Sequence, residues 1–197
     1  MSILRHATPL RWLASLVVVL VGPLPALAAG LSCAGQINCS ETSSFVAMLS
    51  DFRTSVAGND RVATATMRFQ NKLNKPLILG YVTGSGVVTD DKGNRYVPGP
   101  DSVRGIGAVA GSNVDAKFTL EPGEASDARF EFTWKASKAT LGTTYELDLT
   151  VQEFEALAGG QYKPGKERVL HFTNAGQKAA TTVAPTAAAV GVPTDPC

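Results

Sequence analysis

Histidine is the side chain best suited to proton transfer near neutral pH, and this chain of 197 residues has only two. His6 lies in an N-terminal segment with the pattern of a cleaved signal peptide, which leaves His171 in the string VLHFT. We expect His171 on the solvent face of a strand, opposite Leu170 and Phe172. Ser–His and Cys–His catalysis both need an imidazole beside the nucleophile, and zinc sites need several Cys or His ligands. The sequence therefore predicts no catalytic residue, no metal site and no cofactor.

Carboxylates are the remaining side chains that could take part in catalysis or metal binding. Asp90, Asp91 and Asn94 crowd the string DDKGN and could offer oxygens to calcium, which takes six to eight oxygen ligands. The same residue types, with a glycine, also form tight hairpins, and we favour that interpretation. Glu153 and Glu155 could form the carboxyl pair of a glycosidase. A solvated strand edge is the commoner setting for such a pair, so a carboxylate-dependent hydrolase remains an unlikely alternative.

The three cysteines are Cys33, Cys39 and Cys197. The short spacing of Cys33 and Cys39 predicts a disulfide that holds the N-terminal leader, with modest stabilisation because the loop is short. Cys197 is left over at the C-terminus, which suggests an intermolecular thiol, although pairing with one of the other two is open. Lipid anchoring at Cys33 is disfavoured, because the Gly-Leu-Ser at 30–32 has its leucine in the wrong place.

The first 28 residues have the features of a secretory signal peptide. Arg5 and Arg11 precede the apolar run 12–21, and the Ala-Leu-Ala at 26–28 provides small residues for cleavage. The run is shorter than the ~20 apolar residues of a membrane span. We therefore expect a periplasmic or secreted bacterial protein without a membrane span after cleavage.

Charge excludes two classes of partner. Residues 29–197 hold 16 basic and 17 acidic side chains, a net charge of −1 against +1 for the whole chain. Nucleic-acid binding usually requires a strongly basic face, and attachment to anionic lipid requires a polybasic cluster. The expected partner is therefore another envelope or extracellular protein.

Alternation of apolar and polar residues is the dominant pattern of the chain. It is clearest in 62–69, 128–135 and 145–151, each with one charged face, as in half-buried antiparallel strands. Shorter runs indicate further strands at 45–49, 77–82, 86–89, 95–97, 117–120 and 167–172. Residues 29–44 form a small, polar leader, 45–174 the folded domain, and 175–197 an Ala/Thr/Pro-rich tail that is predicted to be disordered.

About eight short strands in one domain predict an all-β sandwich. Its core should be apolar and rich in aromatic side chains, which bury large areas. The expected core residues are Met67, Phe69, Leu77, Leu79, Phe118, Leu120, Phe130, Phe132, Trp134, Leu147, Leu149 and Phe172.

Three strings carry a family resemblance. VATATMRFQNKLNKPLIL, VVTDDKGNRY and FTLEPGEASDARFEFTW resemble a group of bacterial exported immunoglobulin-like (telokin-like) domains of unknown function. Shared features are the Asn-Lys turn, the hairpin with Asp and Gly-Asn, and the Leu-x-Pro-Gly-Glu turn. The resemblance covers about residues 56–135 and implies an immunoglobulin-like antiparallel sandwich of about 7–9 strands outside the cytoplasm. It implies no catalytic residues.

Residues 98–113, PGPDSVRGIGAVAGSN, combine four glycines and two prolines with apolar side chains. A loop this long is unusual unless it is functional. It either folds back as an edge strand or presents an apolar contact surface, with Val103, Arg104, Ile106 and Val109 as candidate partner-binding residues. The sequence as a whole favours an exported, non-enzymatic module that binds a protein or has a structural role in the cell envelope. The alternative is an envelope component linked covalently through Cys197.

Overall fold

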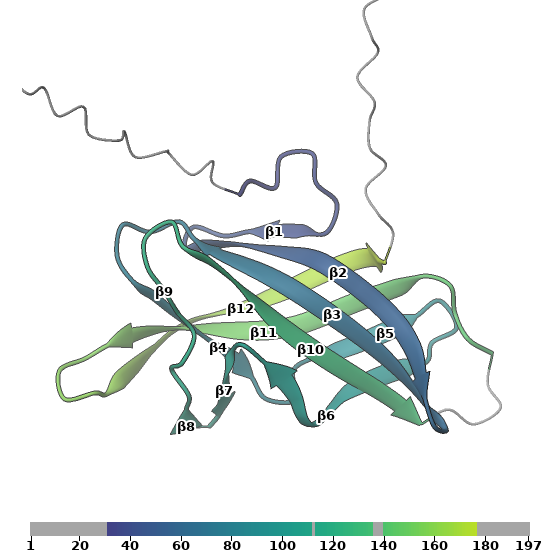
Figure 1. Ribbon diagram of the computed structural model, residues 1–197. Coiled ribbons are helices and arrows are strands. Elements are labelled where there is room, and N and C mark those ends of the chain that lie inside the picture. Colours follow the sequence, from purple (N-terminus) through teal and green to yellow (C-terminus); the bar gives the residue numbers. More distant parts are fainter. Residues whose placement is uncertain (1–30, 112, 136–139, 177–197) are drawn as a thin grey trace, which may run out of the picture.

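The computed structural model describes residues 31–111, 113–135 and 140–176, and every regular element in them is a β-strand (Figure 1). The predicted signal peptide, most of the predicted tail and Cys197 lie outside these residues. In chain order the strands are β1 (Cys39–Glu41), β2 (Phe45–Ala57), β3 (Asp60–Asn71), β4 (Leu77–Val82), β5 (Val87–Asp90), β6 (Arg95–Arg104), β7 (Gly107–Ala110), β8 (Asn113–Val114), β9 (Thr119–Leu120), β10 (Ala125–Lys135), β11 (Tyr145–Ala156) and β12 (Tyr162–Ala175).

Sheet A has the strand order β1-β2-β3-β10-β6, with every pair antiparallel. Its long strands β3 and β10 pair without interruption from Asp60–Lys135 to Gln70–Ala125. The alternating residues explain this register, because a slip by one residue would turn the apolar face outward. Ala63, Ala65 and Met67 consequently point inward, and Thr64, Thr66 and Arg68, which alternate with them, point outward.

Sheet B is built around β11. On one side β11 pairs with β12, and on the other it pairs first with β5 and then with β4. Strand β4 in turn pairs with β9 and with β7, the latter in parallel, and β7 pairs with β8. Figure 1 shows sheet A lying across the strands of sheet B, with the β11–β12 hairpin extending beyond the sandwich.

Strand β6 belongs to both sheets. Its first residues, Arg95 and Tyr96, pair with β5 in sheet B, whereas Val97, Pro98, Val103 and Arg104 pair with β10 in sheet A. Pro98 lies just after this change of partner, and it lacks the backbone N–H group that would donate to the ladder. The two sheets are therefore joined along one continuous strand.

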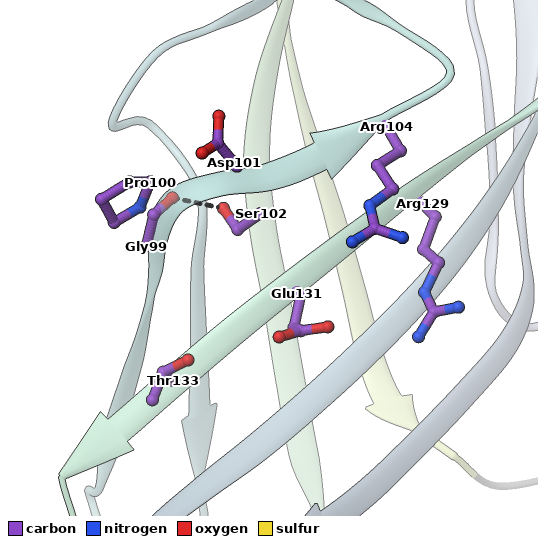
Figure 2. Close-up of a pocket in the computed structure, with 8 residues that line it drawn as sticks. All are labelled: Gly99, Pro100, Asp101, Ser102, Arg104, Arg129, Glu131 and Thr133. Carbon is purple, nitrogen blue, oxygen red and sulfur yellow. Dashed lines mark hydrogen bonds between the residues drawn. The ribbon is translucent and has the colours of Figure 1, made fainter. Parts of the chain in front are cut away.

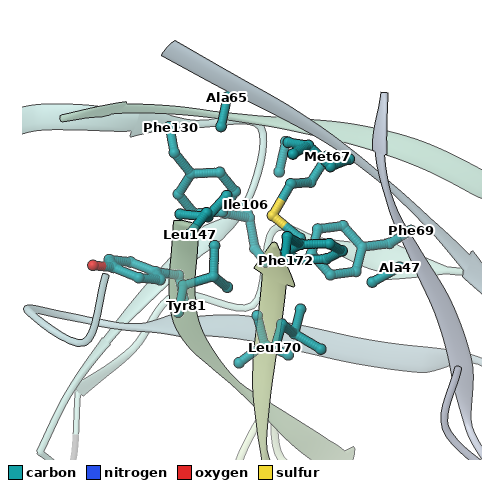
Figure 3. Close-up of a cluster of buried hydrophobic side chains, with 14 of the residues drawn as sticks. Ala47, Ala65, Met67, Phe69, Tyr81, Ile106, Phe130, Leu147, Leu170 and Phe172 are labelled. Atoms are coloured by element: carbon teal, nitrogen blue, oxygen red, sulfur yellow. The ribbon is translucent and has the colours of Figure 1, made fainter. Parts of the chain in front are cut away.

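The core fills the space between the sheets. Sheet A contributes Ala65, Met67, Phe69 and Phe130, and sheet B contributes Leu147, Leu170 and Phe172 from the opposite side (Figure 3). Eleven of the twelve core residues predicted from the sequence are buried. Trp134 is the exception: it lies near the end of β10, is only partly buried, and packs against the ring of Tyr96 with 5.7 Å between ring centroids.

Two of the turns that carry the family resemblance contact each other. The side-chain amide of Asn71, in the first turn, donates to the carbonyl oxygens of Lys75 at 2.8 Å and Leu120 at 2.9 Å. Its backbone N–H donates to the carbonyl of Glu124 at 2.9 Å. Asn71 is buried, so these bonds satisfy polar groups that would otherwise be costly to remove from water. The turn residues therefore fasten the end of β3 to the β9–β10 connection.

The prediction of an all-β sandwich is confirmed. The twelve strands exceed the expected 7–9 because β1, β7 and β8 are only two to four residues long and lie in segments without clear alternation. Strand β1 adds the end of the leader to sheet A. Most of the described residues of 98–113 lie in the second half of β6, in β7 and at the start of β8, so the segment folds back as strand structure.

Candidate functional site

The outer face of sheet A is polar and carries most of the exposed arginines of that sheet. Arg53 on β2 forms an ion pair with Asp51, with 2.8 Å between Nε and a carboxylate oxygen. Arg68 on β3 forms a second pair with Asp127 on β10, at 3.4 Å. Both pairs are solvent-exposed, so each contributes little to stability. They do neutralise their own charges, and this distinguishes them from the arginines at the β6 edge.

Arg104 and Arg129 lie directly opposite each other in the β6–β10 ladder. Neither guanidinium has an ion-pair partner among the residues that the structure describes. Like charges at opposed positions of an antiparallel pair repel each other. Figure 2 shows the two side chains next to each other, with Glu131 below Arg104. Together these residues line one side of a shallow pocket of about 230 Å³.

A bulge in β6 forms the rim of this pocket. Pro98 pairs with Phe132 and Val103 with Phe130, so residues 99–102 have only Glu131 opposite them and project from the sheet. The bulge is held by a hydrogen bond of 2.6 Å from the Ser102 hydroxyl to the Gly99 carbonyl. Asp101 has a φ of 57°, a left-handed conformation that short polar side chains tolerate. Its carboxylate points away from Glu131 in Figure 2, so it does not face the guanidinium groups.

Gly105 fixes the end of β6 next to Arg104. Its φ is 82°, and a Cβ at this position would lie 2.5 Å from the Asp127 carbonyl oxygen. Only glycine avoids both the strained φ and the clash. The chain therefore turns sharply inward after Arg104, and Ile106 enters the core.

The four candidate partner-binding residues do not share one surface. Ile106 and Val109 are buried, and Val103 is partly buried against the core. Only Arg104 presents an exposed side chain. The apolar members of the set therefore pack inside the protein, because a strand pattern in a Gly-rich segment turns them inward. The sequence pattern does not distinguish Arg129, since only the strand register places it opposite Arg104.

Glu153 and Glu155 lie at the far end of β11, along a groove of about 450 Å³ that also includes Lys75, Lys166 and Arg168. Glu153 accepts a hydrogen bond of 2.9 Å from Arg168 Nε, and both side chains of this pair are partly buried. Glu155 is exposed. Glu153 thus supports the β11–β12 hairpin rather than standing free beside Glu155.

The Asp90–Asn94 turn is filled by hydrogen-bond donors from the protein. The backbone N–H groups of Lys92, Asn94 and Gly142 donate to the Asp90 carboxylate at 3.0, 2.9 and 2.9 Å, and the Asn94 amide donates at 2.8 Å. Burial raises the pKa of Asp90, but these hydrogen bonds outweigh burial and hold the pKa below its usual value. The described residues contain no group of three or more His, Cys, Asp or Glu placed to hold a metal ion.

His171 lies on the exposed face of β12, with Leu170 and Phe172 facing the core on either side, as predicted. Its Nδ1 lies 2.6 Å from a carboxylate oxygen of Asp148 on the neighbouring strand β11. This is an exposed cross-strand pair, and it is separate from the Arg104–Arg129 pocket.

Cys33 and Cys39 form a disulfide, with 5.3 Å between their Cα atoms. The bridge closes the leader onto β1, and the Leu31 N–H donates to the side chain of Gln70 on β3. The leader therefore lies over the outer face of sheet A near the β1 edge. The residues that the structure describes include no helix with the length and hydropathy of a membrane span.

Comparison with known proteins gives no family assignment: no protein-family model matches the chain, and no curated protein matches it either. Solved structures that are similar to it include the following three. A Northeast Structural Genomics Consortium target has 10% identity and a TM-score of 0.38, covering 72% of this chain and 91% of its own. An uncharacterized β-sandwich protein from Clostridium difficile has 9% identity and a TM-score of 0.32, and the match covers 64% of this chain and 87% of that protein. The ASH/PapD-like domain 7 of human CEP192 has 13% identity and a TM-score of 0.30, and the match covers 85% of this chain and 99% of that domain. At these values the likenesses say nothing about activity.

Proposed function

We propose that this chain is an exported, non-enzymatic β-sandwich module that binds another protein in a bacterial cell envelope or outside the cell. It would belong with the exported immunoglobulin-like (telokin-like) domains that its turns resemble. The N-terminal pattern of a signal peptide supports export. So does the Cys33–Cys39 bridge, because disulfides persist mainly in oxidising compartments.

The Arg104–Arg129 pair is the observation that carries the binding role. The other two arginines described on this face have carboxylate partners, whereas these two are opposed and unneutralised. Repulsion of this kind costs stability. Such a cost is typical of residues kept for recognition, because binding a partner would neutralise them.

Site-specific photo-crosslinking in the native host tests the proposal. A photoreactive residue at Ser102, on the pocket rim, should form an adduct of one defined mass. The same residue at Lys163, on the exposed β11–β12 hairpin, should not. The protein in the adduct is then purified, and its affinity for the mature chain is measured with and without Arg104→Ala and Arg129→Ala.

The matched control is Arg53→Ala, which removes an exposed but ion-paired arginine from the same face. We expect the double variant to lose binding and the control to keep it. Equal adducts from both positions, or equal affinities for both variants, would contradict the proposal.

A covalent envelope link through Cys197 is the second candidate. The disulfide supports it because Cys33 and Cys39 are bonded to each other, which leaves Cys197 without either of them as a partner. The same bridge disfavours lipidation at Cys33, whose sulfur is already bonded. The intact mass of thiol-blocked protein, taken from its native compartment without reductant, tests both export and linkage. Export predicts a chain that begins at Ala29. A covalent link predicts a larger species that disappears with Cys197→Ser.

A further inference from the structure

We infer that Arg104 and Arg129 form a carboxylate-binding site that takes acidic side chains from an extended peptide segment of the partner. This inference rests on the protein-binding role proposed above and names the chemistry of that partner at the same pocket. It specifies that the ligand group is negatively charged, that the guanidinium groups of Arg104 and Arg129 bind it, and that Glu131 repels it.

The pocket lining contains two guanidinium groups and two carboxylates, of which only Glu131 faces the guanidinium groups. Asp127, the carboxylate that precedes Arg129 on the same face of β10, is already paired with Arg68. Glu131 lines the pocket, and no ion pair joins it to Arg104 or Arg129 in the described structure. Asp101 belongs to the rim and points away. Two guanidinium groups therefore face one carboxylate.

The ladder geometry sets the spacing of the two guanidinium groups. Opposed residues of an antiparallel pair have Cβ atoms about 5 Å apart, so both planar forks can reach the same oxyanion. Arginine forks match the two oxygens of a carboxylate, and these charge-assisted bonds are stronger than neutral ones. Arg104 is further fixed by the bulge before it and by Gly105 after it. The backbone thus fixes the positions from which the two arginine side chains extend.

Glu131 repels any anion in the pocket, and it repels a phosphate group more than a carboxylate. A carboxylate has one negative charge, whereas a phosphate monoester carries nearly two at neutral pH. Repulsion from Glu131 is therefore greater for the phosphate. The pocket is partly open to solvent and its lining follows the paired strands β6 and β10, which suits successive side chains of an extended peptide more than an enclosed small molecule.

Nuclear magnetic resonance of the mature chain tests this inference directly. The arginine Nε–Hε signals are followed during titration with a capped hexaglutamate peptide, with capped hexaglutamine, and with inorganic phosphate. We expect saturable shifts of the Arg104 and Arg129 signals with hexaglutamate, no shifts with hexaglutamine, and weaker shifts with phosphate. Arg53 and Arg68 should respond little, since each already has a carboxylate partner.

Two variants sharpen the result. Arg104→Ala with Arg129→Ala should weaken hexaglutamate binding by about tenfold or more. Glu131→Gln, which removes the repelling charge at nearly constant shape, should tighten it. Equal shifts at all four arginines, tighter binding of phosphate, or no effect of Glu131→Gln would overturn the inference.

The two proposals can fail separately. Loss of the photo-crosslinked partner in the double arginine variant, without any hexaglutamate binding, would refute the carboxylate site and leave the protein-binding role intact. Specific hexaglutamate binding without any crosslinked partner would refute the protein-binding role.

Discussion

The Asp90 carboxylate joins two segments that are far apart in the chain. It accepts hydrogen bonds from Lys92 and Asn94 in its own turn and from Gly142, 52 residues away. Asn94 extends the link by donating to the Thr140 carbonyl at 2.9 Å. Gly142 has no room for a side chain, because a Cβ there would lie 2.3 Å from an Asp91 oxygen. The turn therefore holds the segment that leads into β11 in place through these hydrogen bonds.

Asp90→Asn should lower the free energy of unfolding at neutral pH by about 2 kcal/mol, because a charged acceptor of several hydrogen bonds is replaced by a neutral amide. The folded pKa of Asp90 lies below its unfolded value. Its stabilising contribution is therefore complete above the ordinary aspartate pKa of about 3.9 and is lost as the pH falls through the lower folded pKa. Urea denaturation between pH 2 and 7 should show a weaker acid dependence in the variant.

Asp101→Asn is the control for this experiment. Asp101 is also in a turn-like conformation, but its side chain is exposed and points away from the sheet. Asparagine tolerates the same positive φ. An equal loss of acid dependence in both variants would contradict the assignment of the effect to Asp90.

The β6–β10 pair shows how an element can hold a site at a cost to its own stability. Arg104→Thr should raise the free energy of unfolding by about 0.5 kcal/mol, because it removes a like charge opposite Arg129. The gain should shrink in 1 M salt, where charges are screened over about 3 Å. Arg53→Thr breaks an ion pair instead and should give no gain. Thermal unfolding at low and high salt measures both variants, and a gain that is unaffected by salt would count against repulsion.

Ile106 lies two residues after the end of β6, and its side chain packs in the core. It is 4% exposed, so Ile106→Ala should lower the free energy of unfolding by about 2–5 kcal/mol. Chemical denaturation measures the loss, and Val97→Ala is a suitable control because Val97 is 51% exposed. A partner-contact role for Ile106 requires the opposite result, with binding lost and stability unchanged.

The predictable strands are those with local alternation. Residues 62–69, 128–135 and 145–151 carry their own pattern, so β3, β10 and β11 and most of the core could be inferred from the sequence. Strands β7 and β8 show no such pattern, because they are short and lie in a glycine-rich segment. The opposed arginines could not be inferred at all. Their meeting depends on the register of two strands that are separated by some twenty residues and a bulge.

The whole molecule is held by its core, and the disulfide adds a local constraint at one edge. The Cys33–Cys39 bridge spans a sequence separation of six residues, for which chain entropy predicts about 2 kcal/mol of stabilisation. Changing both cysteines to serine should therefore lower the unfolding midpoint in urea while far-ultraviolet circular dichroism of the folded protein stays unchanged. Complete unfolding of the double variant in buffer would show that the leader has a larger role in the fold.

The crossing of β6 from one sheet to the other has a mechanical consequence. In a sandwich whose sheets touch only through side chains, a shearing force can slide one layer over the other without breaking a strand ladder. Here the chain from Arg95 to Arg104 is hydrogen-bonded to β5 at one end and to β10 at the other, so sliding must rupture one of these ladders. The domain should therefore yield to tension in a single rupture event, and the arginine pocket at the end of β6 should keep its shape until that rupture.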